Sequence, residues 1–239
     1  VDETGCYATT TQELIVNPIP TVLVGPAYEV CDDDYDGIGS YNLSTLDETL
    51  LDGQTGVSIS YYESQEDADN ATNVLDVTYQ NTITDTQTLY VRLEVDETGC
   101  YATTTQELIV NPIPTVLVGP AYEVCDDDYD GIGSYNLSTL DETLLDGQTG
   151  VSISYYESQE DADNATNVLD VTYQNTITDT QTLYVRLEVD ETGCYATTTQ
   201  ELIVNPIPIY TNIIDQILCT DTPGFFDIFL SDYDVQVLN

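Results

Sequence analysis

Three aspartates at alternate positions, followed by a glycine, form the pattern in this chain that most directly predicts chemistry. Asp32, Asp34 and Asp36 precede Gly37, and the same residues recur 94 positions later. Carboxylates at this spacing converge on a hard cation, the glycine permits the bend that aims them, and the seventh position offers a backbone carbonyl. The sequence therefore predicts two calcium sites, with these candidate ligands: Asp32, Asp34, Asp36, Ile38, Asp126, Asp128, Asp130 and Ile132.

The loop departs from an EF-hand loop at its twelfth position, where Leu43 stands in place of a bidentate glutamate. A solvated acidic turn is the alternative interpretation, because aspartate and glycine are common turn residues. Mutual repulsion of the carboxylates favours the cation. In a third, divergent unit the segment from Thr220 to Gly224 has lost two of the three aspartates, so no site is expected there.

Six cysteines fall at two recurring places, and the chain has no histidine. This pattern indicates disulfides rather than zinc ligands, and disulfides indicate an oxidising, extracytoplasmic compartment. Bridges within a repeat would join Cys31 to Cys100 and Cys125 to Cys194, whereas a bridge between repeats would join Cys6 to Cys31. The chain-entropy model gives about 4 and about 3.5 kcal/mol for the two pairings, which does not separate them. We expect the bridges within repeats, because a domain should be complete in itself.

The charge is extreme: 44 acidic residues stand against two arginines, which gives a formal net charge of −42. Nucleic acid is excluded as a partner, because phosphate binding needs clustered Lys and Arg. No apolar run is long enough to span a membrane, so no membrane insertion is expected in this chain. With no lysine or histidine to act as a base or nucleophile, we expect no enzymatic activity.

The chain repeats itself with a period of 94 residues, a length typical of one independent domain. The recurring Asn-Pro-Ile-Pro segment is a short, stiff hinge, because proline cannot sit in a central strand. We therefore expect four parts: the last hairpin of a preceding repeat (1–20), two identical repeats (21–114 and 115–208) and the start of a divergent repeat (209–239).

Alternation of apolar and polar residues predicts strands throughout each repeat. The expected strands are 40–43, 57–62, 78–84, 87–95 and 101–110, and one short helix is expected from the cap-like Ser64 to Ala71. Short strands separated by frequent turns are typical of an immunoglobulin-like sandwich. The predicted fold is all-β, with tandem immunoglobulin-like β-sandwich domains arranged as beads on a string.

Several motifs occur together in each repeat and in a fixed order. They are Val-Cys-Asp-Asp-Asp-Tyr-Asp-Gly (30–37), Ser-Tyr-Tyr-Glu-Ser-Gln-Glu-Asp-Ala (60–68), Gln-Thr-Leu-Tyr-Val-Arg-Leu-Glu (87–94), Thr-Gly-Cys-Tyr (98–101) and Leu-Ile-Val-Asn-Pro-Ile-Pro (14–20). This combination resembles the tandem repeats of giant cell-surface adhesins of Bacteroidota, of the gliding-motility type exported by type IX secretion. The resemblance implies an extracellular filament on the bacterial outer surface that adheres to surfaces or extracellular polysaccharide.

The expected function is a structural and adhesive stalk, held by disulfides and calcium, in which neighbouring repeats of the same chain contact each other. The alternative is an accessory carbohydrate- or cation-binding module of a large secreted enzyme. Because residues 21–94 and 115–188 are identical, no repeat has been tailored individually to a ligand. Number and linkage of repeats therefore matter more than any single site.

Overall fold

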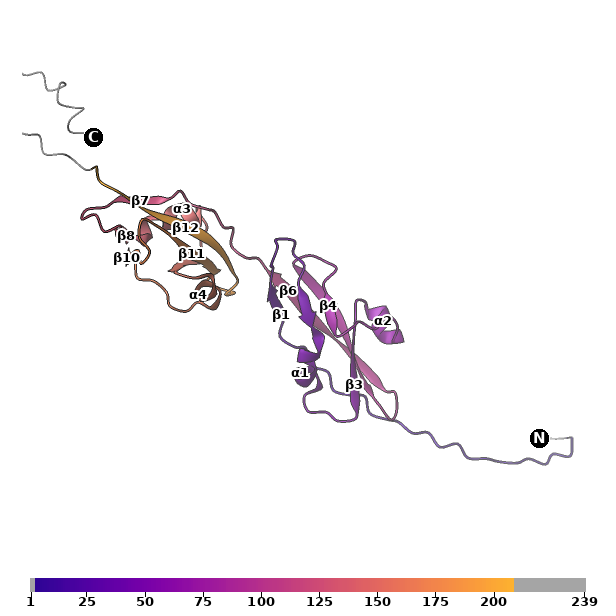
Figure 1. Cartoon of the computed structure of the whole chain (residues 1–239). Helices are drawn as coiled ribbons and strands as arrows, with labels where there is room; N and C mark the ends of the chain where they lie inside the picture. Colours follow the sequence, from indigo (N-terminus) through magenta and orange to yellow (C-terminus); the bar gives the residue numbers. More distant parts are fainter. Residues whose placement is uncertain (1–2, 209–239) are drawn as a thin grey trace, which may run out of the picture. The chain divides into compact units, whose positions relative to one another are not determined.

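The computed structural model describes residues 3–208 of the chain (Figure 1). It divides into two compact units, Val1–Ile113 and Pro114–Asn239, so the division falls inside the Asn-Pro-Ile-Pro segment. The expected divergent repeat (209–239) lies outside the described residues, together with Cys219 and the acidic loop that has lost its aspartates.

Each unit is built on a four-stranded sheet. In the first unit its order is β1 (Tyr28–Cys31), β6 (Tyr101–Asn111), β5 (Thr86–Val95) and β3 (Val57–Tyr62). β5 pairs antiparallel with both β6 and β3, whereas β1 runs parallel to β6, with Tyr28 opposite Leu108. The second unit repeats this order with β7 (Tyr122–Cys125), β12 (Tyr195–Asn205), β11 (Thr180–Val189) and β9 (Val151–Tyr156).

A smaller sheet covers one face of the larger one. It pairs β2 (Ser40–Asn42) with β4 (Thr78–Gln80) in the first unit, and β8 (Ser134–Asn136) with β10 (Thr172–Gln174) in the second. The second and fourth strands thus form one sheet and the third, fifth and sixth the other, as in immunoglobulin domains. The prediction of an all-β fold with tandem sandwich domains is confirmed.

The core lies between the two sheets and follows the alternation of β5. Leu89, Val91 and Leu93 are completely buried, and they pack against Tyr41 of β2 and Tyr79 of β4. The equivalent residues build the core of the second unit: Leu183, Val185, Leu187, Tyr135 and Tyr173. Burial of alternate residues from both sheets is what holds the sandwich together.

Short helices fill the connections between strands. The expected helix is α2 (Gln65–Asn70), where the Ser64 hydroxyl accepts the N–H of Asp67 at 3.1 Å, as an N-cap does. A 3₁₀ turn, η1 (Leu43–Leu46), leads into a second helix, α1 (Asp47–Leu51), although only one helix was expected. The second unit has η2 (Leu137–Thr139), α3 (Asp141–Leu145) and α4 (Gln159–Asn164) in these places.

Residues 5–20 form neither strand nor helix, although their sequence is that of 99–114, which contain β6. In a complete repeat these residues pair with the strand before them, β5 or β11, and residues 5–20 have no such pairing. The expected hairpin strand is therefore not formed within 5–20.

Candidate functional site

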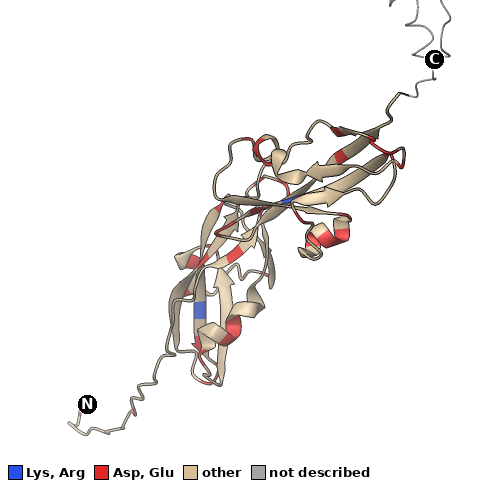
Figure 2. Ribbon diagram, turned by 90° about the vertical axis from the view of Figure 1, so that its left-hand side faces the viewer, with Lys and Arg blue, Asp and Glu red and all other residues tan. Residues whose placement is uncertain are grey.

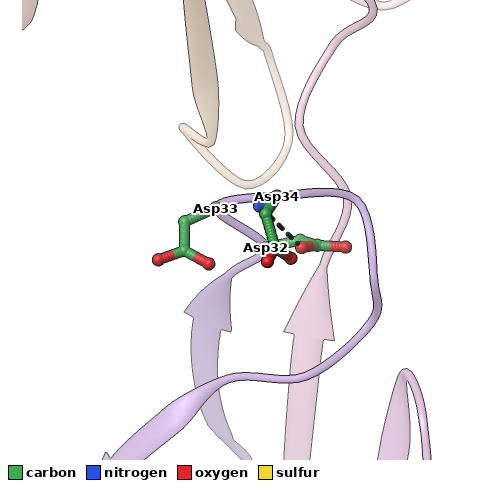
Figure 3. Close-up of side chains that lie close together, drawn as sticks. All are labelled: Asp32, Asp33 and Asp34. Atoms are coloured by element: carbon green, nitrogen blue, oxygen red, sulfur yellow. Dashed lines mark hydrogen bonds between the residues drawn. The ribbon is translucent and has the colours of Figure 1, made fainter.

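The acidic loop that follows β1 is organised around the carboxylate of Asp32, which is only 7% exposed. One of its oxygens, Oδ1, accepts the N–H groups of Asp34 at 3.2 Å and Tyr35 at 2.9 Å, and Oδ2 accepts that of Gly37 at 2.9 Å. Figure 3 shows the loop closing around this side chain, with the bond from Asp34 drawn. Asp32 therefore shapes the loop as well as being a candidate ligand.

The pKa values of the aspartates reflect this division of roles. Burial raises the pKa of Asp32, but hydrogen bonds from four backbone N–H groups outweigh it and bring the value below the ordinary one. The pKa of Asp34 is raised, first by desolvation and then by the negative charge of Asp36. A nearby cation would favour the ionised form of Asp34 and so counteract the repulsion from Asp36.

The structure brings some of the predicted ligands together. Carboxylate oxygens of Asp32, Asp33 and Asp34 lie within 4.8 Å of one another in the first unit, and those of Asp126, Asp128 and Asp130 do so in the second. Oxygens bound to one calcium ion at 2.3–2.6 Å lie no more than about 5 Å apart, and both groups meet this distance criterion. The N–H of Ile38 donates to Oδ1 of Asp36 at 2.7 Å.

A buried asparagine that the sequence analysis missed fixes the far side of the loop. The Nδ2 of Asn81, a residue 4% exposed, donates to the carbonyls of Gly37 at 2.9 Å and Ile83 at 2.8 Å. Its Oδ1 accepts the N–H of Gly39 at 2.6 Å. Gly37 has φ +75°, and a Cβ there would lie 2.8 Å from Oδ1 of Asp85. The far side of the loop is thus held against the segment between β4 and β5.

The two cysteines of a repeat lie at opposite ends of the large sheet. Cys31 ends β1 opposite Asn111, whereas Cys100 directly precedes β6 in the β5–β6 turn. The eleven strand residues Tyr101–Asn111 span about 36 Å at roughly 3.3 Å per residue, whereas a disulfide needs Cα atoms within about 7 Å. Cys31 and Cys194 are disulfide-bonded, while Cys100 and Cys125 are free thiols. The expected bridges Cys31–Cys100 and Cys125–Cys194 are therefore wrong.

The path of the chain shows at which end of the large sheet it enters a repeat and at which end it leaves. Thr21 exchanges two hydrogen bonds with the side chain of Gln54, and nearby Gly56 accepts the N–H of Asp96 in the β5–β6 turn. The chain thus joins each repeat at the end that carries the Cys100-type cysteine, which we call the incoming end. It leaves after Asn111, beside the Cys31-type cysteine and the acidic loop, at the outgoing end.

The single basic residue of each repeat is buried and serves the fold. Arg92 is 7% exposed, donates to Glu94 at 2.8 Å through Nε, and lies 3.4 Å from the ring centroid of Tyr101. It also donates to the carbonyls of Ala68 and Asp69, which fastens helix α2 onto β5. Acidic residues are spread over strands, helices and loops (Figure 2), so the described surface presents almost exclusively negative charge.

No helix among residues 3–208 is long and apolar enough to cross a membrane.

The predicted site residues belong to two features of each repeat: the acidic loop at the outgoing end and the cysteines at the two ends.

Comparison with known proteins places both repeats in one family. The model of the Flavobacterium inter-domain disulphide bond domain matches residues 27–114 and again 121–208, which together exceed half of the chain. No curated protein matches the chain.

Similarity to solved structures is weak. An endo-fucoidan hydrolase, MfFcnA4 from glycoside hydrolase family 107, is 9% identical with a TM-score of 0.20, over 80% of this chain and 31% of that one. The bradyzoite-specific antigen BSR4 from Toxoplasma gondii is 9% identical with a TM-score of 0.19, over 79% of this chain and 93% of that one. Protocadherin Gamma B7 extracellular cadherin domains 1–4 are 11% identical with a TM-score of 0.20, over 83% and 54%. Similarities at this level carry no argument about function.

Proposed function

We propose that this chain, which belongs to the Flavobacterium inter-domain disulphide bond domain family, is the structural repeat region of a long extracellular filament on a bacterial surface. The observation that carries the proposal is the placement of the two cysteines at opposite ends of each repeat. Such cysteines cannot close one repeat on itself, and they are placed to link repeats in series. Disulfides also require the oxidising conditions found outside the cytoplasm.

The linkage follows from the direction of the chain. Cys31 lies at the outgoing end of the first repeat, and Cys194 lies at the incoming end of the second. Only three residues, 112–114, separate Asn111 from Thr115, which bonds to Gln148 of the second repeat as Thr21 bonds to Gln54. We propose a bridge from Cys31 to Cys194, and in a longer array from each loop cysteine to the turn cysteine of the following repeat. The alternative pairing considered from sequence, Cys6 with Cys31, would instead join a turn cysteine at the incoming end of one repeat to a loop cysteine at the outgoing end of the next.

Thiol counting tests this pairing, because the identical repeats give identical peptides around Cys31 and Cys125. In denatured, non-reduced chain, Cys31→Ser should expose one additional thiol, that of Cys194. The matched variant Cys125→Ser should instead remove one thiol, since Cys125 is free. A thiol gained in Cys100→Ser or in Cys125→Ser would refute the linkage between repeats, because those cysteines would then have been bridged.

Within this filament we assign the chain a mechanical and adhesive role rather than an enzymatic one. The repeats carry 18 carboxylates and one arginine each, so neighbouring filaments repel and the array stays soluble. Surfaces or extracellular polysaccharide are the proposed partners of the whole filament, as in gliding-type adhesins exported by type IX secretion. Adhesion of cells should then extend over a shorter distance when repeats are deleted, measured as the gap between cell and surface, while the strength per filament stays unchanged.

We further propose that the acidic loops bind calcium. The support is the grouping of carboxylate oxygens around a loop whose shape Asp32 and Asn81 already fix, together with the raised pKa of Asp34. Bound cations would neutralise charge at the outgoing end of every repeat, where five residues hold four aspartates (32–36).

A further inference from the structure

We propose that the parallel pair β1–β6 is the force-bearing clamp of each repeat, so that the repeat resists being pulled apart by its two ends. The inference rests on the proposed filament function, because only a chain held at both ends carries tension. It goes beyond that function by assigning the load to one pair of strands.

The load falls on this pair because of topology. β1 is the first strand of the repeat and β6 the last, and they are neighbours with Tyr28 opposite Leu108 and Cys31 opposite Asn111. Tension pulls β1 backward through its beginning and β6 forward through its end. Since the strands are parallel, these two forces slide one strand along the other. The hydrogen bonds between them are then loaded together, whereas strands pulled apart from one end lose their bonds one at a time.

Side chains reinforce the pair at both of its ends. Where β1 begins, the fully buried Gln106 of β6 donates through Nε2 to the carbonyl of Pro26 at 2.6 Å. A Cβ on Gly25 would lie 2.6 Å from Oε1 of Gln106, so the chain approaches β6 here as only glycine permits. Where β1 ends, the side chain of Asn111 donates to Glu29 at 2.8 Å and its carbonyl accepts the N–H of Asp32 at 2.8 Å.

The same arrangement supplies a matched pair of substitutions. In a parallel ladder alternate residues of an edge strand direct their N–H groups toward the neighbouring strand. Asp126 donates its N–H to Asn205, so Val124, two residues earlier, points the same way, and Glu123 points outward. Proline removes an N–H group and is tolerated on an edge strand where that group faces solvent. Val124→Pro therefore breaks the ladder, whereas Glu123→Pro keeps the ladder and removes only the side-chain bond that Glu123 accepts from Asn205 at 2.8 Å.

The first test stretches the whole 239-residue chain by its termini under reducing conditions, one molecule at a time. Forced rupture reports the barrier to unfolding rather than equilibrium stability. Each repeat should release about 300 Å of chain in one step, from 94 residues at roughly 3.3–3.6 Å each. In Val124→Pro one step should stay at the wild-type force, because the first repeat is an unaltered copy, and the other should drop by at least about half. In Glu123→Pro the altered step should lose much less force than in Val124→Pro, because the ladder is kept and only one side-chain bond is removed.

The second test changes only the direction of pulling. With the other five cysteines replaced by serine, one handle is attached to Cys125 and the other to the C-terminus. The force then acts on Cys125 at the end of β7 and on Asn205 at the end of β12, which lie opposite each other, so the two strands are peeled apart instead of sheared. The rupture force should fall well below that of the same variant pulled by its termini. Equal forces in the two directions, or equal steps in Val124→Pro, would overturn the clamp.

The oxidised chain separates this inference from the proposed linkage. If Cys31 is joined to Cys194, residues 32–193 cannot contribute to extension, and the long steps disappear until reductant is added. Long steps in the oxidised chain would count against the linkage and leave the clamp supported, whereas weak steps in the reduced chain would count against the clamp alone.

Discussion

At the scale of single residues, the charged side chains that matter most are those the fold has partly withdrawn from water. Asp32 accepts the backbone N–H groups of Asp34, Tyr35 and Gly37 at 2.9–3.2 Å and so shapes the acidic loop without a ligand. Arg92 is enclosed between helix α2 and Tyr101 and holds the helix on the sheet. Most other acidic residues are exposed and act through their total charge.

The loop-forming role of Asp126, the counterpart of Asp32, predicts a pH-dependent loss of stability on substitution. Its pKa lies below the ordinary value of 3.8, since burial is outweighed by backbone N–H bonds led by that of Gly131. A lowered folded-state pKa stabilises the fold above 3.8, and this contribution is lost as pH falls through the folded-state pKa. Asp126→Asn should therefore lower Tm at neutral pH, and the difference from wild type should close in acid.

Asp127→Asn is the matched control, because it removes the same charge from the next residue, which is exposed. Its Tm should stay close to that of wild type across the same pH range. A gap between wild type and Asp126→Asn that stayed constant down to strong acid would show that the carboxylate does not organise the loop through its ionised form.

At the scale of elements, each repeat has one helix of five residues and one of six. The residue that follows each helix has left-handed backbone angles although it is not glycine. Helix α2 is followed by Ala71 at φ 52°, and its counterpart α4 by Ala165 at φ 50°. This backbone region is unfavourable for a residue with a Cβ and normal for glycine. The repeats therefore retain a local cost at the end of the helix that Arg92 fastens.

Ala165→Gly should stabilise the second repeat by about 0.5–1 kcal/mol, the left-handed cost being partly offset by the greater freedom of glycine in the unfolded chain. The same change at Ala162, buried inside helix α4, should destabilise by about 1 kcal/mol or more. Calorimetry can resolve both effects, because the first repeat is an unaltered reference in the same molecule. A lower transition temperature in Ala165→Gly would contradict the argument.

The sequence predicted the elements whose signals are local. Alternation gave β5 and β6 nearly to their observed bounds, and Ser64 marked the start of α2. It missed β1, because four residues of weak pattern become a strand only by pairing with residues about 80 positions later. It missed α1 because no side chain caps it, and burial of Leu50 against the core accompanies it instead. The prediction of the cysteine pairing was wrong for a related reason. Chain entropy is nearly equal for both pairings, and only the strand register shows that the two cysteines of a repeat lie at opposite ends of the sheet.

At the scale of the whole molecule, a net charge of −42 opposes compaction and is sensitive to the solution. Screening shortens the reach of such repulsion from about 30 Å at 0.01 M to about 8 Å at 0.15 M salt. Sodium chloride should therefore raise Tm gradually. Calcium at matched ionic strength should raise it further, since a ligand that binds only the folded state stabilises it.

Two variants separate a calcium site from general screening. Asp128→Asn, within the carboxylate group of the second unit, should lose the additional effect of calcium in that repeat. Asp170→Asn removes the same charge from an exposed position outside the loop and should keep it. If EDTA leaves Tm unchanged and both variants respond alike, calcium has no role in the acidic loop.

The placement of one cysteine at each end makes a repeat a directional monomer, as in a polymer that grows head to tail. Such heterologous linkage stays open unless its rotation closes a ring. An array of any number of repeats then leaves one loop cysteine and one turn cysteine over, and in the described residues Cys125 and Cys100 hold those positions. Duplicating or deleting a whole 94-residue unit changes the length of the array without stranding a thiol inside it. Copy number can therefore vary freely in evolution, and the length of the array becomes a heritable quantity that changes in equal increments.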